Sequence, residues 1–245
     1  MSIPDIAKPA ETAGQTKAGL PYRIDGTIQQ TLLTDLDPGR TLFSDAGAMS
    51  WMSASVQMRT HASGGMGGML KRAFAGGTLF LVDFTAAGAA GHVAFSADFP
   101  GKILPFELDA NRSVIMHKHA FLCAEKSVSL DIFFTRRLGA GLLGGEGFVL
   151  QKLTGPGAVF AELDGDAIEY ALKPGEVLRV EPGHVAMFED TIQFDIEMIQ
   201  GFTNVLMGGE GLFLATLTGP GRVWLHSLTP SKIAHRIAVY LPSRG

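Results

Sequence analysis

The sequence of 245 residues predicts an all-β fold, and three observations support this prediction. A 17-residue segment recurs 64 residues later, apolar and polar residues alternate along several short stretches, and Pro-Gly pairs separate these stretches. Strict alternation is typical of a half-buried strand, because successive side chains of a strand point to opposite faces. Pro-Gly pairs favour turns, since proline presets φ and glycine accepts positive φ.

The internal repeat is the strongest of these signals. Residues 144–160 match residues 208–224 at 11 of 17 positions. The offset of 64 also holds upstream, where Val114 lies over Leu178. Self-similarity at a fixed offset indicates a chain built from equivalent supersecondary units.

A third, more diverged copy precedes these two. Residues 37–42 match residues 173–178 at an offset of 136, and residues 76–80 match residues 144–148 at an offset of 68, which places a small insertion within 64–70. The sequence therefore predicts one compact domain with these parts: a flexible N-terminal arm (1–23) and three pseudo-symmetric β units (24–100, 101–164, and 165–245 with the C-terminal segment).

Alternation is clearest in two stretches that lie one offset apart. Apolar side chains occupy every second position of residues 128–134. Residues 192–198 repeat the pattern, with Gln193, Asp195 and Glu197 between the apolar positions. Both stretches are predicted to be half-buried antiparallel strands.

Turns are predicted at the Pro-Gly pairs 38–39, 174–175 and 182–183, and at the repeated Gly-Gly-Glu-Gly and Thr-Gly-Pro-Gly blocks. The structural turn residues of these blocks are Gly144, Gly145, Glu146, Gly147, Gly155, Pro156, Gly157, Gly208, Gly209, Glu210, Gly211, Gly219, Pro220 and Gly221. Two interpretations of Glu146 and Glu210 stay open: part of the turn geometry, or a symmetric acidic ring. These turns account for much of the high glycine content, 31 residues.

Two segments depart from the β pattern. Residues 69–74 suggest one helical turn after the glycine-rich stretch. Residues 229–239 suggest a short C-terminal helix, because Thr229 is a good N-cap, Pro230 suits the first helical position, and apolar residues follow at helical spacing.

Composition and charge exclude several classes of protein. The net charge of −4 disfavours broad binding to nucleic-acid backbones, which requires a basic surface. A single cysteine, Cys123, rules out an internal disulfide and is expected to be a buried, inert thiol. No apolar run is long enough to span a bilayer, and residues 1–20 lack the apolar core of a signal peptide, so we expect a soluble, cytoplasmic protein.

The order of several motifs resembles a known family. These motifs are Asp37-Pro-Gly-Arg, Gly47-Ala-Met-Ser-Trp-Met, Lys71-Arg-Ala-Phe-Ala-Gly-Gly-Thr-Leu-Phe, Pro100-Gly and the two glycine-rich blocks. Over about residues 22–240 the chain is similar to the altered-inheritance-of-mitochondria (AIM) biogenesis family. The resemblance implies units like the tryptophan RNA-binding attenuation protein (TRAP), each a short double-stranded β-helix, and a homotrimer that completes a nine-unit ring. It implies no assigned biochemical activity, and eukaryotic members are linked to mitochondrial inner-membrane organisation.

One enzymatic alternative is a cupin-like metal site. His117 and His119 form a His-x-His pair on a predicted strand, and His184 follows a Pro-Gly pair as in the second cupin element. The spacing departs from the cupin pattern, because Glu125 stands one or two residues too far from His119. The register of the repeat also puts these histidines on different units, so we expect no metal and no cofactor.

A glycine- and methionine-rich segment, residues 64–74, is the predicted contact loop. Its candidate contact residues are Met66, Met69, Leu70 and Phe74, since methionine suits adaptable apolar surfaces. The segment lacks the Gly-Lys-Ser/Thr of a phosphate loop. An unidentified protein or a membrane surface is the expected partner.

Together these patterns favour a non-enzymatic, oligomeric β scaffold or binding protein. Two alternatives stay open: a cupin-like metal-dependent enzyme that uses His117, His119 and His184, and an RNA-binding ring suggested by fold analogy alone.

Overall fold

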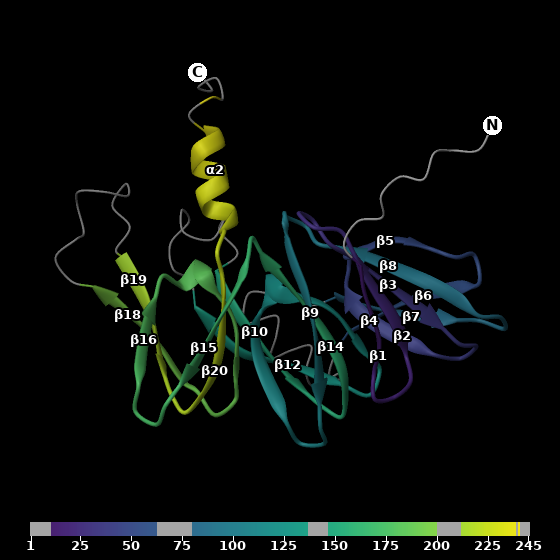
Figure 1. The fold of residues 1–245 in the computed structure, drawn as a ribbon, viewed down its shortest axis with the longest axis horizontal. Coiled ribbons are helices and arrows are strands. Elements are labelled where there is room, and N and C mark those ends of the chain that lie inside the picture. Colours follow the sequence, from purple (N-terminus) through teal and green to yellow (C-terminus); the bar gives the residue numbers. More distant parts are fainter. Residues whose placement is uncertain (1–10, 63–79, 137–146, 200–211, 239, 241–245) are drawn as a thin grey trace.

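The computed structural model describes residues 11–62, 80–136, 147–199, 212–238 and 240. Within these residues the fold consists of antiparallel β-sheets side by side and one short C-terminal helix, α2 (Pro230–Ala238), which rises above the C-terminal part of the row (Figure 1). The all-β class and the C-terminal helix are therefore confirmed. No helix among the described residues has the length and apolar character needed to cross a bilayer.

Eighteen of the strands fall into three consecutive sets of six. The first set is β3 (Thr31–Leu36), β4 (Thr41–Asp45), β5 (Met49–Met52), β6 (Val56–Ala62), β7 (Phe80–Ala86) and β8 (Gly91–Ser96). The second set is β9 (Gly101–Leu108), β10 (Ser113–His117), β11 (Phe121–Glu125), β12 (Ser129–Arg136), β13 (Phe148–Thr154) and β14 (Gly157–Asp164). The third set is β15 (Ala167–Leu172), β16 (Val177–Val180), β17 (Val185–Glu189), β18 (Gln193–Ile199), β19 (Leu212–Thr218) and β20 (Gly221–His226).

The pairing order is the same in all three sets. The first strand pairs with the sixth, the second with the fifth, the third with the sixth and the fourth with the fifth. Two further pairings join neighbouring sets: β4 with β11, and β10 with β17. The boundaries of the three units remain a prediction from the sequence.

The two alternating stretches form strands β12 and β18, as predicted. In β18, Ile196 is buried, whereas Gln193, Asp195 and Glu197 are exposed. In β12, Leu130 is buried and the next residue, Asp131, is exposed. The buried apolar side chains of the described residues form three clusters. One of them includes a group of stacked and edge-packed phenylalanines: Phe134, Phe148, Phe188 and Phe194.

Most of the predicted turns lie where the sequence indicates. Gly39 and Gly175 adopt φ of +86° and +76° in their Pro-Gly turns. The Thr-Gly-Pro-Gly blocks connect β13 to β14 and β19 to β20, and Gly221 there has φ +147°. The third Pro-Gly pair differs, because Pro182–His184 forms the short 3-10 helix η2 rather than a simple turn.

Part of the predicted flexible arm is ordered, which corrects that expectation for residues 11–23. β1 (Glu11–Gln15) and β2 (Pro21–Asp25) form a hairpin, and β2 extends the sheet beside β3. Leu20 is fully buried, and the ring of Tyr22 packs edge-on against Phe160 at 5.2 Å between centroids. These apolar side chains attach the segment to the core.

The C-terminal helix begins as predicted. The hydroxyl Oγ1 of Thr229 accepts the backbone N–H of Lys232 at 3.3 Å, so Thr229 acts as the N-cap and Pro230 is the first helical residue. The contact-loop residues Met66, Met69, Leu70 and Phe74, and with them the helical turn expected in residues 69–74, lie outside the described residues. So do Gly144, Gly145 and Glu146 of the first Gly-Gly-Glu-Gly block, and Gly208, Gly209, Glu210 and Gly211 of the second.

Candidate functional site

The three candidate metal-binding histidines lie at neighbouring strand ends. His117 closes β10 and is buried, and its ring centroid lies 5.2 Å from that of exposed His119 in the short helix η1 (Lys118–Ala120). His184 lies in η2, where its Nδ1–H donates to the backbone carbonyl of His226 at 2.6 Å. The structure thus places all three in one region of the fold.

His226, at the end of β20, is a fourth member that sequence reasoning missed. Its Nδ1 accepts the backbone N–H of Asp164 at 2.9 Å, a contact between residues 62 positions apart. Burial, followed by the nearby His184 and His119, lowers the pKa of His226 to about 4. A buried imidazole with this pKa is neutral at pH 7.

The surroundings of these histidines do not favour a metal site. Burial, and then the nearby His119, keeps the pKa of His117 well below its usual value. Lys232 donates to Nε2 of His184 and therefore occupies the lone pair that a metal would need. Across the described ranges, no three His, Cys, Asp or Glu side chains have a geometry that could hold a metal ion.

A buried acidic pair lies next to this region, at the end of β14. Burial raises the pKa of Glu162 to about 8 against the opposing hydrogen bond from the backbone N–H of Asp98. Burial also raises the pKa of Asp164 to about 6, and the Asp98 carboxylate adds to this rise. Oε2 of Glu162 accepts the backbone N–H of Asp98 at 2.9 Å. The sequence contains one weak signal of this pair: both carboxylates stand at the end of a strand whose other members are apolar.

Cys123 is buried, as expected. Burial, with a further contribution from Glu125, raises the pKa of its thiol well above the usual value, so the thiolate is strongly disfavoured.

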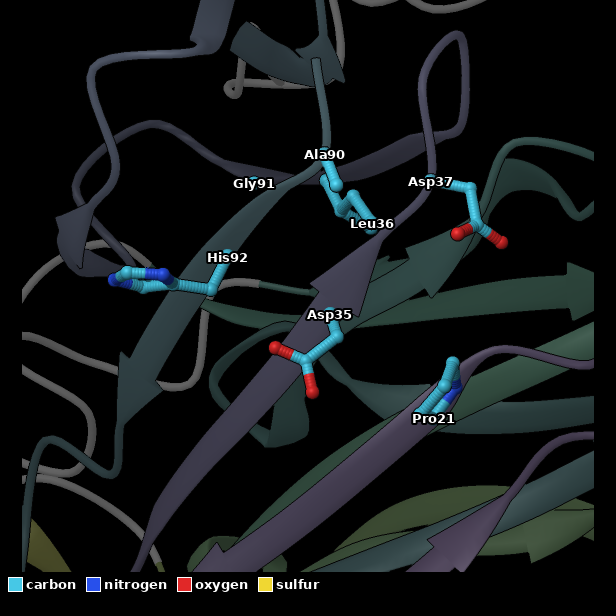
Figure 2. A pocket seen from close by; sticks show the side chains of 7 residues that line it. All are labelled: Pro21, Asp35, Leu36, Asp37, Ala90, Gly91 and His92. Atoms are coloured by element: carbon cyan, nitrogen blue, oxygen red, sulfur yellow. The ribbon is translucent and has the colours of Figure 1, made fainter.

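A surface hollow of about 330 Å³ lies between the ends of β2, β3 and β8 (Figure 2). Two carboxylates and one imidazole reach it, from Asp35, Asp37 and His92, and all three side chains are exposed. Figure 2 shows that these side chains point in different directions and do not converge on one point. The hollow therefore does not bring an acid, a base and a nucleophile together.

Two sheet edges form the more distinctive feature. β5 is the last strand of the sheet β1-β2-β3-β8-β5, and β16 is the first strand of the sheet β16-β19-β18. Within their sets of six, β5 is the third strand and β16 is the second strand. The other third strands, β11 and β17, and the other second strands, β4 and β10, are paired on both sides.

Side chains at equivalent positions of the third strands differ sharply in exposure. The offset of 64 places Cys123 over Met187, and the offsets of 136 and 64 together place Trp51 over Cys123. Strand pairing supports this register, because β5, β11 and β17 each carry an irregularity just before these residues. Cys123 and Met187 are fully buried, whereas 48% of Trp51 is exposed.

Side chains at equivalent positions of the second strands differ in exposure in the same way. Leu42 in β4 and Val114 in β10 are buried, whereas the equivalent Leu178 in β16 is partly exposed. Arg179 and Val177 of β16 are exposed, the latter at 52%. Sequence reasoning missed these edges, although the repeat register already aligned Leu42, Val114 and Leu178.

Comparisons with known proteins agree with this architecture. The family model described as Mitochondrial biogenesis AIM24 matches residues 22–228. An uncharacterized protein of Streptococcus pyogenes serotype M6 is 25% identical over 230 residues, which cover 91% of each chain. An X-ray crystal structure of a Streptococcus pyogenes protein has a TM-score of 0.73 and 22% identity, and the match covers 91% of this chain and all of the other; it supports the fold alone.

Proposed function

We propose, from the premise that this chain belongs to the mitochondrial biogenesis AIM24 family, that it is a non-enzymatic β scaffold whose copies assemble through β5 and β16. The observation that supports this proposal most directly is a strand-to-strand junction that occurs twice within the chain. β5 and β16 are equivalent to the two strands that form this junction. The third strand of one set pairs there with the second strand of the preceding set. β16 of one copy and β5 of the next would make the same pairing between chains.

The in-chain junctions define a register for this pairing. At the first junction, Leu42 lies opposite Glu125. At the second, the equivalent Val114 lies opposite Glu189. The repeat offsets then place Leu178 of one copy opposite Ser53 of the next, and Val180 opposite Trp51.

A shared hydrogen bond supports this equivalence. Glu125 Oε2 accepts the backbone N–H of Ala158 at 2.9 Å, and Glu189 Oε2 accepts that of Arg222 at 3.0 Å. Ser53 takes the same place in the first set, where its Oγ accepts the backbone N–H of His92 at 2.9 Å.

Pairing of two edges also explains why they are unprotected. An unpaired strand exposes backbone donors and acceptors, and proteins usually block such edges with charges, prolines or a covering segment. β5 instead presents Trp51, and β16 presents Val177 near a single charge, Arg179. Joining two different surfaces gives a head-to-tail contact, which closes into a ring when the rotation fits. Three copies and nine units are what the family resemblance implies, and we place the assembly in the cytoplasm.

Light scattering of the purified protein tests the assembly. We expect a mass about three times the 26.0 kDa of one chain. Trp51→Lys should give the single-chain mass with the fold intact, because the side chain is half exposed within one chain and needs desolvation only at the junction. Met58→Lys is the matched control, since Met58 is 46% exposed but lies on β6. A strictly monomeric wild-type protein, or an unchanged mass for Trp51→Lys, would overturn the proposal.

The two alternative functions are less favoured. A cupin-like enzyme requires converging metal ligands, and the part of the chain that the structure describes brings no such group together. An RNA-binding ring requires a basic surface, whereas the net charge is −4.

A further inference from the structure

Within the part of the chain that the structure describes, the C-terminal helix α2 is attached to the fold at its base. Oε2 of Glu181 lies 3.5 Å from Nζ of Lys232, which also donates to His184. Beyond this first turn the helix rises away from the sheets (Figure 1). Its far end carries large exposed apolar side chains: Ile237 is 51% exposed and Tyr240, in the turn that follows, is 86% exposed.

These apolar residues lie on one side of the helix. Ile233 and Ile237 are four positions apart in α2, and Tyr240 lies in the turn that follows, where its N–H donates to the carbonyl of Ile237, three positions earlier, at 2.9 Å. Residues three or four positions apart lie on one side of a helix or helical turn, so the three side chains form one narrow stripe. Lys232 and Arg236, also four positions apart, lie along one side of this stripe. The result is an apolar stripe with cations along one side.

Charge is distributed unevenly between this end and the rest of the chain. Residues 228–245 contain three basic residues and no acidic residue, whereas the remainder contains 17 basic and 24 acidic residues, a net charge of −7. A nine-residue helix is about 13 Å long, which exceeds the Debye length of about 8 Å at physiological salt. The acidic body is therefore largely screened from a surface that touches the tip of α2.

We infer that α2 docks on the surface of an anionic phospholipid bilayer. Ile237 and Tyr240 would enter the boundary between headgroups and acyl chains, and the Arg236 guanidinium would contact lipid phosphates. Tyrosine suits this boundary because its ring is apolar and its hydroxyl is polar. A helix with a cationic flank and no acidic residue suits a fluid anionic bilayer, because binding to a bilayer does not require a groove that matches the helix.

Vesicle co-sedimentation of the full chain tests this inference. We expect binding to vesicles of phosphatidylcholine with phosphatidylglycerol, weak binding to phosphatidylcholine alone, and loss of the difference at high salt. Arg236→Gln should weaken binding to the anionic vesicles about fivefold. The double substitution Ile237→Ser and Tyr240→Ser should weaken it at least about tenfold.

A control substitution removes an exposed isoleucine elsewhere. Ile28 is 75% exposed between β2 and β3, so Ile28→Ser loses a similar apolar surface without touching α2. It should bind vesicles like the wild type. Urea midpoints should agree among all these variants, because the changed side chains are exposed. Equal vesicle binding by the double variant and the wild type would overturn the inference. So would a drop in the light-scattering mass of the double variant without lipid, which would assign the stripe to contact between copies.

Discussion

Replacing the buried carboxyl of Glu162 by an amide should change how the stability of this protein depends on pH. Glu162 is 6% exposed at the end of β14, and its Oε2 accepts the backbone N–H of Asp98. Glu162→Gln keeps the shape and an oxygen acceptor but cannot ionise. The substitution therefore removes one titration and leaves the packing in place.

The size of the effect follows from the pKa. Burial raises the pKa of Glu162 from 4.5 to about 8; the nearby Asp98 and Asp164 carboxylates add to this, and the Asp98 N–H opposes it. The unfolded chain therefore releases this proton at lower pH than the folded chain. The stability contributed by the protonated group is complete below pH 4.5 and is lost as pH rises toward 8. The loss is about 1.4 kcal/mol per pH unit, or about 3 kcal/mol at pH 7.

Urea unfolding of the wild type and of Glu162→Gln across this pH window measures the difference. We expect the unfolding free energy of the wild type to fall more steeply with pH, so that the variant becomes the more stable protein toward neutral pH. Glu197→Gln, at an exposed position of β18, is the control and should follow the wild type. Parallel curves for the wild type and Glu162→Gln would show that the carboxyl is ionised in the folded protein and would refute the reasoning.

Three further predictions concern stability. Because burial lowers the pKa of His226 from 6.5 to about 4, the wild type should lose stability as pH falls through this range, and His226→Gln should lose about 2 kcal/mol less in urea unfolding between pH 6.5 and 5; equal losses would contradict a buried neutral imidazole. Gly221→Ala should cost about 1–3 kcal/mol, since φ is +147° and an added Cβ would lie 2.6 Å from Oγ1 of Thr191. A shift no larger than that of Gly175→Asn, in an open turn, would refute this. Phe188→Ala should cost about 3–5 kcal/mol, because Phe188 is fully buried, and an unchanged urea midpoint would argue against the aromatic core.

The sequence predicted the parts of this fold that depend on local pattern. Alternation in residues 128–134 and 192–198 gave strands, because a half-buried strand leaves a period of two in the sequence. Thr229 and Pro230 indicated the start of α2, because capping is a local interaction. Family membership was also predicted correctly from the order of the glycine-rich motifs.

The remaining features depend on contacts between distant residues. The N-terminal hairpin was missed because its order comes from burial of Leu20 and from Tyr22 packing on Phe160, well over a hundred residues away. His226 was missed for a similar reason, because it meets Asp164 only after β14 and β20 come together. The open edges were also missed, although the repeat contained their register, because a sequence does not state which strands have a neighbour.

The difference between β5 and β16 gives the proposed assembly a direction. Each chain then has two different ends, the β5 edge and the β16 edge. A copy in which one of these edges is blocked still binds a neighbour through the other. Trp51→Lys and Val177→Lys proteins, each unable to form a ring alone, should combine when mixed into a dimer joined by the one intact pair of edges. Either protein should also prevent ring closure in every assembly that it joins, so the closed ring should become rarer as the share of the variant in a mixture with the wild type rises.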